Sequence, residues 1–467
     1  MKISELVTRR SLIIAAGSAT AGAMLASCAD AKTPASAAFT PEAFGAKGDG
    51  TTDDTTAFQR LAAAVNANGG GEIVLRPVTY LVGRQEGVRG GYAFAPAALL
   101  ALKDCRLPVV IWGNGGRLRC APHLRFGTFD RRGDRHDHAM PFTFPGFSAT
   151  PYEHMILVQG CRGPVQITDL ELDGNIQQLR IGGPWGDTGW QIPAIGLFLS
   201  GNTGPVLVRN VFTHHHAQDG LMISAPSGSA PSRIENLRSA FNARQGCSFI
   251  GGSDFTFVGC RFTDTGRAKI GSAPGAGVDL EAESSPIRRL RFIDCEFARN
   301  EGVGMVADSG DTADVTFDQC RFMGDRNWAV WPNKPRFRFT HCQFVGSIVQ
   351  CFDAADPAEG TMFTDCRFTD LLRRGADGKP LAPGPIADLS SARSTLFRRC
   401  TFTVSHGFAL PWSLHAIYNS CSMHQSGGPM GYPRGIYRGT STIVGKVDLY
   451  GSKIMGVVTI NGQKRTA

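Results

Sequence analysis

Charged residues are scarce in this sequence, and the motifs of two large functional classes are missing. Of its 467 residues only 19% are charged, against 42% hydrophobic residues and 57 glycines, which excludes a disordered chain and a coiled coil. No glycine-rich phosphate loop leads from a strand into a helix, so we expect no nucleotide cofactor. The basic residues are not interleaved with aromatic residues on one surface, so we expect no nucleic-acid partner.

Long hydrophobic runs are absent from the chain after its amino-terminal segment, which excludes a membrane-spanning helix in that part of the sequence. The stretch "TRRSLII" carries Arg9 and Arg10 and resembles a twin-arginine export signal, and "LASC", ending at Cys28, resembles a lipobox. We therefore expect residues 1–27 to be a signal peptide. The protein is then an exported bacterial envelope lipoprotein, periplasmic or held at the outer membrane, with a lipid on Cys28 as its membrane contact. An ordinary signal peptide with a chance cysteine is the alternative.

The net charge gives a weak indication of the partner. The formal charge is +8, and removal of residues 1–27, with Lys2, Arg9, Arg10 and Glu5, subtracts 2 and leaves +6. A mildly basic mature protein favours an anionic partner. We expect that protein to act as a monomer.

Cysteine pairs spaced Cys-x-x-Cys are also absent, although the chain has 13 cysteines. An exported protein with this many cysteines would normally form disulfides. Seven of them instead occupy a recurring Phe-x-x-Cys-x-Phe frame, complete or degraded, at intervals of 35, 25, 22, 24, 34 and 21 residues: Cys260, Cys295, Cys320, Cys342, Cys366, Cys400 and Cys421. We expect these cysteines to be reduced and to pack inward as small hydrophobic residues, in preference to disulfides or metal binding.

The repeat predicts an all-β solenoid. Each frame is followed by a turn and a short alternating strand that begins near a glycine, as in "DGLMIS", "QGCSFI" and "AGVDLEAE". A solenoid needs covered ends. Asp53 and Asp54 are expected to cap an alanine-rich amphipathic helix that runs to about Val65 and closes the amino-terminal end.

Three motifs connect the chain to a known group of proteins. "FGAKGDGTTDDTTAFQ", "GGGEIVL" followed by "TYLV", and "LELDGN" resemble the pectate-lyase-superfamily β-helix proteins, including the polygalacturonase and rhamnogalacturonase-like branch. The resemblance implies a single-stranded right-handed parallel β-helix and an extracytoplasmic carbohydrate-active role. We expect a linker over 28–38, the β-helix over 39–424 and a carboxy-terminal β cap over 425–467. The usual Pro-Gly-Thr-Tyr is here Pro77-Val78-Thr79-Tyr80.

The stretch "GVDLEAES" places three acids, Asp279, Glu281 and Glu283, at every second position. Because strand side chains alternate between two faces, the acids are expected to point outward. Their neighbours Val278 and Leu280 then fill the interior, as do Leu221 and Ile223, Cys247 and Phe249, and Val303 and Met305. Neighbouring coils carry small or apolar residues at the outward positions, so the acids are expected on a groove floor.

Asp279 and Glu281 suit two kinds of chemistry. Two residues along a strand span about 6.6 Å, which lies within the range of roughly 6.5–9.5 Å between acid and base in inverting glycoside hydrolases. Alternatively, Asp279, Glu281 and Glu283 bind Ca²⁺, and His215, His216, Lys269 or Arg267 serves as base or neutralising cation in a polysaccharide lyase. No other cofactor is indicated. A non-catalytic glycan-binding adhesin is the third possibility.

The polygalacturonase site pattern is not present, because the outward positions expected on the next coil are Gly304 and Val306. The paired acids are more similar to the in-strand pair of β-helical carrageenases. We therefore expect cleavage of a polysaccharide, anionic in view of the net charge, by hydrolysis with the in-strand carboxylate pair, with elimination as the alternative.

Residues on adjacent coils and loops complete the predicted site. Loop excursions are expected at 121–155 and 176–193, where they would form cleft walls. The "DRHDH" stretch at 134–138 could bind a metal but matches no closed zinc pattern. The predicted catalytic residues are Asp279, Glu281, His215, His216 and Asp219, and the predicted substrate contacts are Arg244, Arg267, Lys269, Trp185, Trp190, Glu301 and Asp308.

Overall fold

The computed structural model describes residues 38–466, apart from 89–91, 97–98, 144 and 373–383. The predicted signal peptide, Cys28 and the linker up to residue 37 lie outside the described residues. Ala38–Ala467 form one compact unit. Within the described ranges, no helix is both long and apolar enough to cross a bilayer.

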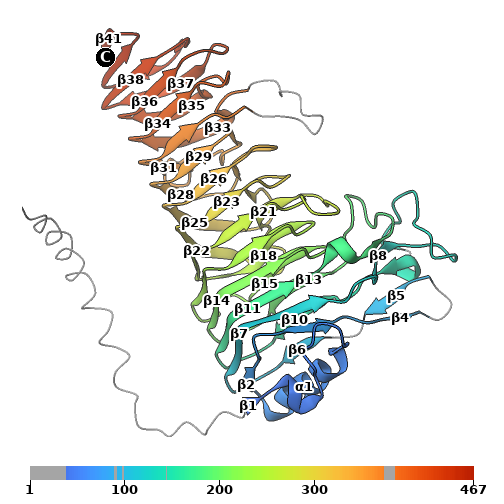
Figure 1. Ribbon diagram of the computed structural model, residues 1–467. Helices are drawn as coiled ribbons and strands as arrows, with labels where there is room; N and C mark the ends of the chain where they lie inside the picture. The colour runs from blue at the N-terminus through green and yellow to red at the C-terminus, as the bar shows by residue number, and fades with distance from the viewer. Residues whose placement is uncertain (1–37, 89–91, 97–98, 144, 373–383, 467) are drawn as a thin grey trace, which may run out of the picture. The chain divides into compact units, whose positions relative to one another are not determined.

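A short 3₁₀ helix, η1 (Pro41–Phe44), and one α-helix, α1 (Thr55–Asn68), cover the first coil (Figure 1). The apolar face of α1 is buried, with Phe58, Leu61 and Val65 at most 1% exposed. The helix ends three residues later than predicted, where Gly69 adopts a left-handed φ of 76°. The predicted amino-terminal cap of the solenoid is therefore present.

The two predicted capping aspartates behave differently from each other. Asp53 accepts the backbone N–H of Thr55 through Oδ1 at 2.9 Å. Asp54 precedes the helix but makes no capping hydrogen bond with its side chain. Its carboxylate instead accepts the N–H groups of Lys47 and Gly48 at 2.7 and 3.0 Å, so the predicted capping role of Asp54 is wrong.

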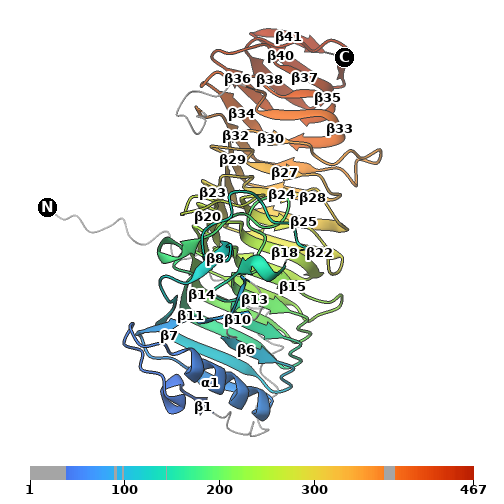
Figure 2. The ribbon, with the colours of Figure 1, turned by 90° about the vertical axis from the view of Figure 1, so that its right-hand side faces the viewer.

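The remaining chain winds into a right-handed parallel β-helix, as predicted (Figures 1 and 2). Strands from successive coils pair in parallel and form ladders along the helix. One ladder contains β1 (Ala38–Phe39), β2 (Gly71–Val74), β7 (Val109–Cys120), β11 (Val165–Asp173), β14 (Val206–His214), β16 (Ser232–Glu235), β19 (Phe255–Val258), β22 (Ile287–Ile293), β25 (Thr312–Asp318), β28 (Phe337–Thr340), β31 (Met362–Thr364) and β33 (Ala387–Arg398).

A second ladder begins with β3 (Thr79–Val82) and uses the later halves of β7, β11 and β14. It continues through β17 (Arg238–Ala240), β20 (Arg261–Thr263), β23 (Glu296–Ala298), β26 (Arg321–Met323), β29 (Gln343–Val345), β32 (Arg367–Thr369), β34 (Thr401–Val404), β36 (Ser422–Gln425), β38 (Thr440–Val444) and β40 (Val457–Ile460).

The ladder that carries the acids is here named the groove ladder. Figure 2 shows it stacked coil upon coil. It contains β6 (Leu100–Lys103), β10 (His154–Gln159), β13 (Ile195–Ser200), β15 (Asp219–Ser224), β18 (Gln245–Ser253), β21 (Ala276–Leu280), β24 (Met305–Ala307), β27 (Val330–Pro332), β30 (Ile348–Val349) and the first parts of β33, β35 (Trp412–Asn419) and β37 (Tyr432–Arg438).

The repeated frame builds the core as predicted. Its phenylalanines stack from coil to coil, for example Phe297 on Phe322 at 4.6 Å between ring centroids. The thiols lie between the rings and the backbone: Sγ of Cys320 donates to the carbonyls of Phe292 and Asp318, each at 3.4 Å. The 12 cysteines of the described residues are buried and free, which confirms the packing role.

The expected loop excursions form a small second sheet beside the groove ladder. It orders β12 (Arg180–Ile181), β8 (Arg125–Thr128), β9 (Ser148–Ala149), β5 (Phe94–Pro96) and β4 (Gln85–Gly87), with short 3₁₀ turns η2 (Pro145–Phe147) and η3 (Ile176–Gln178). The contribution of β4 and β5 was not anticipated, because no repeat marks that segment.

The parallel pairing continues past the predicted boundary at residue 424. β36 pairs with β38, and β38 with β40, while β39 (Lys453–Ile454) extends the first ladder through β35 and β37. β41 (Gln463–Thr466) then lies antiparallel to β40. The segment expected to be a separate cap is thus a continuation of the coils with an antiparallel last strand.

Candidate active site

Across β15, β18, β21, β24 and β27, one row of outward positions on the groove ladder has Asp279 as its acidic member. The register partners in successive coils are Met222, Ser248, Asp279, Val306 and Trp331. Their inward neighbours, among them Cys247, Val278 and Met305, are 0% exposed. The alternation of strand side chains therefore predicted correctly that Asp279 points outward. Aligning the strands by their first glycines gave a register that differs by two residues, because the structure places Gly304 opposite Gly277. Val303 is an exception, since it packs with Val306, Trp328 and Trp331 and lines the cavity described next.

A cavity of about 710 Å³ opens over this row. Its lining combines acids, amides, one guanidinium and apolar surface. The residues that contribute are His154, Thr188, Gln191, Pro193, Ile195, Phe198, Gln218, Met222, Arg244, Gln245, Ser248, Ile250, Ala273, Pro274, Asp279, Glu281, Glu283, Val303, Val306, Asp308, Asn327, Trp328 and Trp331.

Asp279 is 3% exposed and is held by one side chain. Nε2 of Gln245 donates to its Oδ2 at 2.7 Å, while Oδ1 has no hydrogen-bond partner in the structure. Burial raises the pKa of Asp279 well above its usual range, and the charges of Glu281 and Asp308 raise it further. This shift favours the protonated form of the carboxyl.

Glu281 lies just beyond β21 and is half-buried. Burial raises its pKa, and the charge of Glu283 adds to that effect, while Arg244 opposes it. Ala282 has a left-handed φ of 49°, so the chain turns there and Glu283 is exposed at the rim. The three acids therefore do not share one continuous strand face, yet all three line the cavity together with Asp308.

Arg244 and Asp219 form a buried ion pair between the two coils that precede the coil of Asp279. Nε and Nη2 of Arg244 donate to the two oxygens of Asp219 at 2.9 and 2.5 Å, and Asp219 is 0% exposed. Arg244 reaches the cavity, whereas Asp219 is not among the residues that line it. The catalytic role predicted for Asp219 is wrong; this carboxylate anchors the guanidinium.

The predicted catalytic histidines, His215 and His216, do not lie beside the acids. His216 is 0% exposed, with Nδ1 2.8 Å from the Tyr152 hydroxyl and Nε2 3.2 Å from the carbonyl of Leu172. Burial lowers its pKa well below the usual value. Neither His215 nor His216 is among the described residues that line the cavity, so their predicted place in the active centre is wrong.

The cations expected beside the acids are used elsewhere. Arg267 pairs with Glu301 at 3.1 Å and with Asp325 at 2.7 Å. Nζ of Lys269 donates to the carbonyls of Gln177 and Leu179 at 3.2 and 2.7 Å, which ties two loops together. Arg267, Lys269 and Glu301 do not line the cavity in the described part of the chain, and their predicted substrate contacts are corrected accordingly.

The tryptophans of the cavity are not the ones predicted. Trp185 is buried in the 176–193 loop, and the backbone N–H of Trp190 donates to Oγ of Ser272 at 3.0 Å. Their loop reaches the cavity through Thr188 and Gln191 instead. Trp328 and Trp331 line the cavity, in edge contact at 5.4 Å between ring centroids. Extending the outward row by two further coils would have identified Trp331.

The predicted Ca²⁺ ligands do not converge. Among the described residues, the set of three His, Cys, Asp or Glu side chains with ligand atoms within 4.8 Å of one another is Asp173, His214 and His215. It includes neither the acids at 279–283 nor the "DRHDH" stretch. The arrangement at Asp279 therefore suits proton transfer better than cation binding.

A second cavity of about 750 Å³ lies over the ladder of β19, β22, β25 and β28. Two of its three acids pair with arginine: Asp254 with Arg289 at 2.6 Å, and Asp314 with Arg336. These hydrogen bonds to arginine lower the pKa of both carboxyls. The second cavity therefore differs from the groove, where the pKa values of Asp279 and Glu281 are raised.

Comparison with known proteins agrees with this fold. Residues 155–368 match the family described as "Right handed beta helix region". A capsule KN3-specific depolymerase of Klebsiella phage KN3-1 is 24% identical over 76% of this chain, and the chain spans 42% of the length of that relative.

One solved structure supports the same fold, and a second is given with it for comparison of length. The amino-terminal fragment of gene product 12 of bacteriophage Phi29 is 11% identical with a TM-score of 0.51, over 91% of this chain and 72% of that one. The A-module of the mannuronan C-5 epimerase AlgE4 of Azotobacter vinelandii is 15% identical with a TM-score of 0.44, over 90% and 96%.

Proposed function

We propose that this protein cleaves the glycosidic bonds of a polysaccharide by hydrolysis, and that the cavity over the groove ladder is its active centre. The observation that carries the proposal is the buried carboxyl of Asp279, with Oδ1 free of hydrogen bonds, beside a second carboxyl, Glu281, in a cavity with an aromatic wall. A relative named as a capsule-specific depolymerase supports a glycan-cleaving role.

The two acids would share the work as acid and base. Gln245 donates to Oδ2 of Asp279, which leaves Oδ1 to carry the proton and to donate it to the leaving glycosidic oxygen. Glu281 is less buried than Asp279 and, once ionised, would take a proton from the attacking water. Trp328 and Trp331 provide apolar faces for sugar rings.

The charged groups that line the cavity bear on the charge of the sugar that binds there. Four carboxyl groups line the cavity, against the guanidinium of Arg244, which is already paired with Asp219. An anionic sugar would be repelled beside these acids, so we propose that the sugar units bound at Asp279 are neutral, even if the polymer carries acidic groups elsewhere. This revises the anionic substrate expected from net charge.

Elimination is the second candidate. Arg244 lies close enough to Asp279 and Glu281 to lower the pKa of both, and a cation in that position could neutralise a uronate. The imidazoles and the lysine proposed as bases are outside the cavity, which favours hydrolysis.

The proposal is tested with a panel of capsular and uronate-rich polysaccharides, incubated with the protein with and without EDTA. Size-exclusion chromatography should show shortened chains that lack the ultraviolet absorbance of an unsaturated uronate, with no effect of EDTA. Absorbing products would select elimination. Binding without shortening of any polymer would select the adhesin and overturn the proposal.

We further propose export to the bacterial envelope with a lipid on Cys28, on the strength of the "TRRSLII" and "LASC" motifs, and action as a monomer. The predicted location is tested by fractionating cells that express the full chain, an Arg9→Lys/Arg10→Lys variant or a Cys28→Ala variant. The first variant should stay in the cytoplasm, and the second should lose its membrane association.

A further inference from the structure

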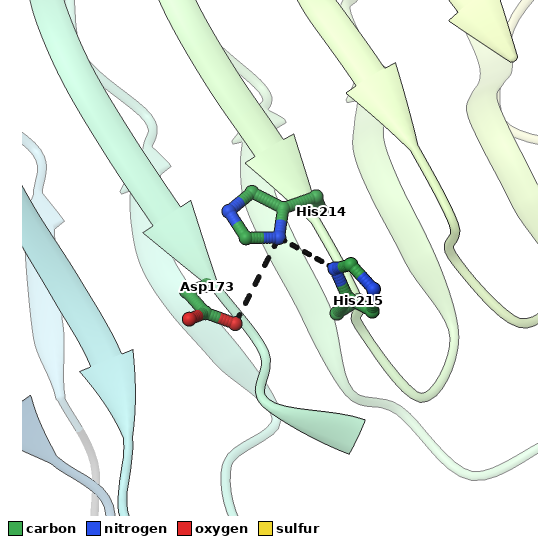
Figure 3. Close-up of side chains that lie close together, drawn as sticks. All are labelled: Asp173, His214 and His215. Atoms are coloured by element: carbon green, nitrogen blue, oxygen red, sulfur yellow. Dashed lines mark hydrogen bonds and ion pairs between the residues drawn. The ribbon is translucent and has the colours of Figure 1, made fainter. Parts of the chain in front are cut away.

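A cluster of two histidines and one aspartate lies on the second ladder, outside the cavity. Asp173 and His214 are the last residues of β11 and β14 and are register partners in adjacent coils, and His215 follows directly. Figure 3 shows the three side chains pointing toward one another from the strand ends. One ligand atom of each lies within 4.8 Å of the other two.

Two consecutive histidines can face the same point because the backbone turns between them. His215 has a left-handed φ of 54°, which ends the strand alternation and brings its side chain back toward that of His214. Both rings are supported from behind: His214 stacks on Phe212 at 4.1 Å and His215 on Phe241 at 5.1 Å. The positions of the imidazoles are therefore set by packing.

Charged neighbours orient the ligand atoms. Nε2 of His214 lies 3.0 Å from Oε1 of Glu171, so its Nδ1 faces Asp173 and His215. Arg117 holds Glu171 at 2.8 Å, and Arg119 lies 3.4 Å from Oδ2 of Asp173. Oδ1 of Asp173 accepts the backbone N–H of Asn175 at 2.9 Å and faces His214. A histidine whose second nitrogen contacts a carboxylate is the usual arrangement at metal sites.

The two Nδ1 atoms are 2.7 Å apart, and Nδ1 of His214 is 3.8 Å from Oδ1 of Asp173. Without a cation, one proton must be shared between the two rings. Ligands of a tetrahedral Zn²⁺, at about 2.0–2.1 Å from the metal, require only a slight separation of the rings.

We propose that Asp173, His214 and His215 bind one Zn²⁺ ion, with a further position left to water. Imidazole and carboxylate ligands in this number suit Zn²⁺ better than Ca²⁺ or Mg²⁺. Because Asp173 and the histidines belong to adjacent coils, the ion would link those coils. Its role is to stabilise the solenoid, since none of its ligands lines the cavity.

The test uses the full chain without a histidine tag, treated with EDTA and dialysed. Calorimetric titration with ZnCl₂ should show one equivalent bound, and Zn²⁺ should raise the melting temperature. His214→Gln and His215→Gln should lose both effects, while their melting temperatures without metal stay near that of the wild type. Glu171→Gln keeps all three ligands and should weaken binding about 10–100-fold.

A matched control removes another pair of histidines, His136→Gln/His138→Gln, whose rings lie 5.8 Å apart in the 121–155 loop. This variant should bind Zn²⁺ like the wild type. The proposal is overturned if the wild type binds no stoichiometric Zn²⁺, if binding survives in both single variants at 214 and 215, or if the control abolishes it. Should the single variants prove unfolded, the result for Glu171→Gln decides: unchanged affinity overturns the site.

Discussion

Gln245 and Asp279 are joined by a hydrogen bond of 2.7 Å between neighbouring coils, and this bond uses only one of the two carboxyl oxygens. The other oxygen, Oδ1, is buried without a hydrogen-bond partner in the structure. A buried oxygen without a hydrogen-bond partner lowers the stability of the fold by about 1–3 kcal/mol. We therefore infer that Oδ1 of Asp279 takes part in the reaction. Four predictions about this site and its surroundings follow from its geometry.

Asp279→Asn should lower the cleavage rate about 10²–10⁴-fold, because the amide keeps the shape but cannot donate an acidic proton. The rate of appearance of reducing ends measures this. Asp388→Asn is a matched control, since Asp388 occupies an outward position further along the same ladder and is not among the described residues that line the cavity. Equal losses in the two variants would contradict the special role of Asp279.

The same substitution should stabilise the fold at neutral and basic pH. The pKa of Asp279 is raised in the folded state, so the stability that its protonation supplies is complete below the unfolded pKa of about 4 and is lost as the pH rises through the folded pKa. Asp279→Asn cannot ionise and escapes this loss. Melting temperatures should favour the variant at pH 8, and the difference should shrink toward pH 4; a difference independent of pH would refute the burial of this acid.

Trp331→Ala should raise KM roughly 10-fold and change kcat less, because an apolar stacking surface contributes mainly to binding. Trp331 lines the cavity, and its Nε1 has no hydrogen-bond partner in the structure. Trp190→Ala is the comparison, since the indole of Trp190 donates to the carbonyl of Gly182 within the 176–193 loop. It should affect stability more than KM, and the reverse pattern would assign the sugar contacts to the loop.

His154 should make the protein sensitive to mild acid. Burial lowers the pKa of this imidazole to about 4, and the nearby Lys103 adds to the effect. Its contribution to stability is present above the unfolded pKa of about 6.5 and is lost as the pH falls through the folded value. Chemical denaturation of His154→Gln between pH 7 and pH 4 should show a shallower loss of stability than the wild type shows. Parallel curves would rule out this histidine as the cause.

The fold and the facing of the acids could be predicted because both rest on short periods. The Phe-x-x-Cys-x-Phe frame repeats once a coil, so it reports the solenoid directly, and strand alternation places Asp279 outside and Val278 inside. Departures arose where the backbone leaves the regular pattern: the left-handed φ at His215 and Ala282 redirects side chains that alternation alone would misplace.

Contacts between coils were the other source of error. Arg244 binds Asp219 across 25 residues of sequence, and Lys269 reaches the carbonyl of Leu179 across 90. Nothing in the local sequence distinguishes a cation that anchors a loop from one that meets a substrate. The same limit explains why His154 and Trp328 were not recognised as parts of the cavity.

The central claim is that the groove at Asp279 cuts a polysaccharide. Its most direct test is the size distribution of a polymer that the wild-type protein shortens, followed over time for the wild type and for Asp279→Asn under identical conditions. We predict a steady fall in chain length with the wild type and a nearly unchanged polymer with the variant. Shortening at the same rate by both proteins would contradict the account.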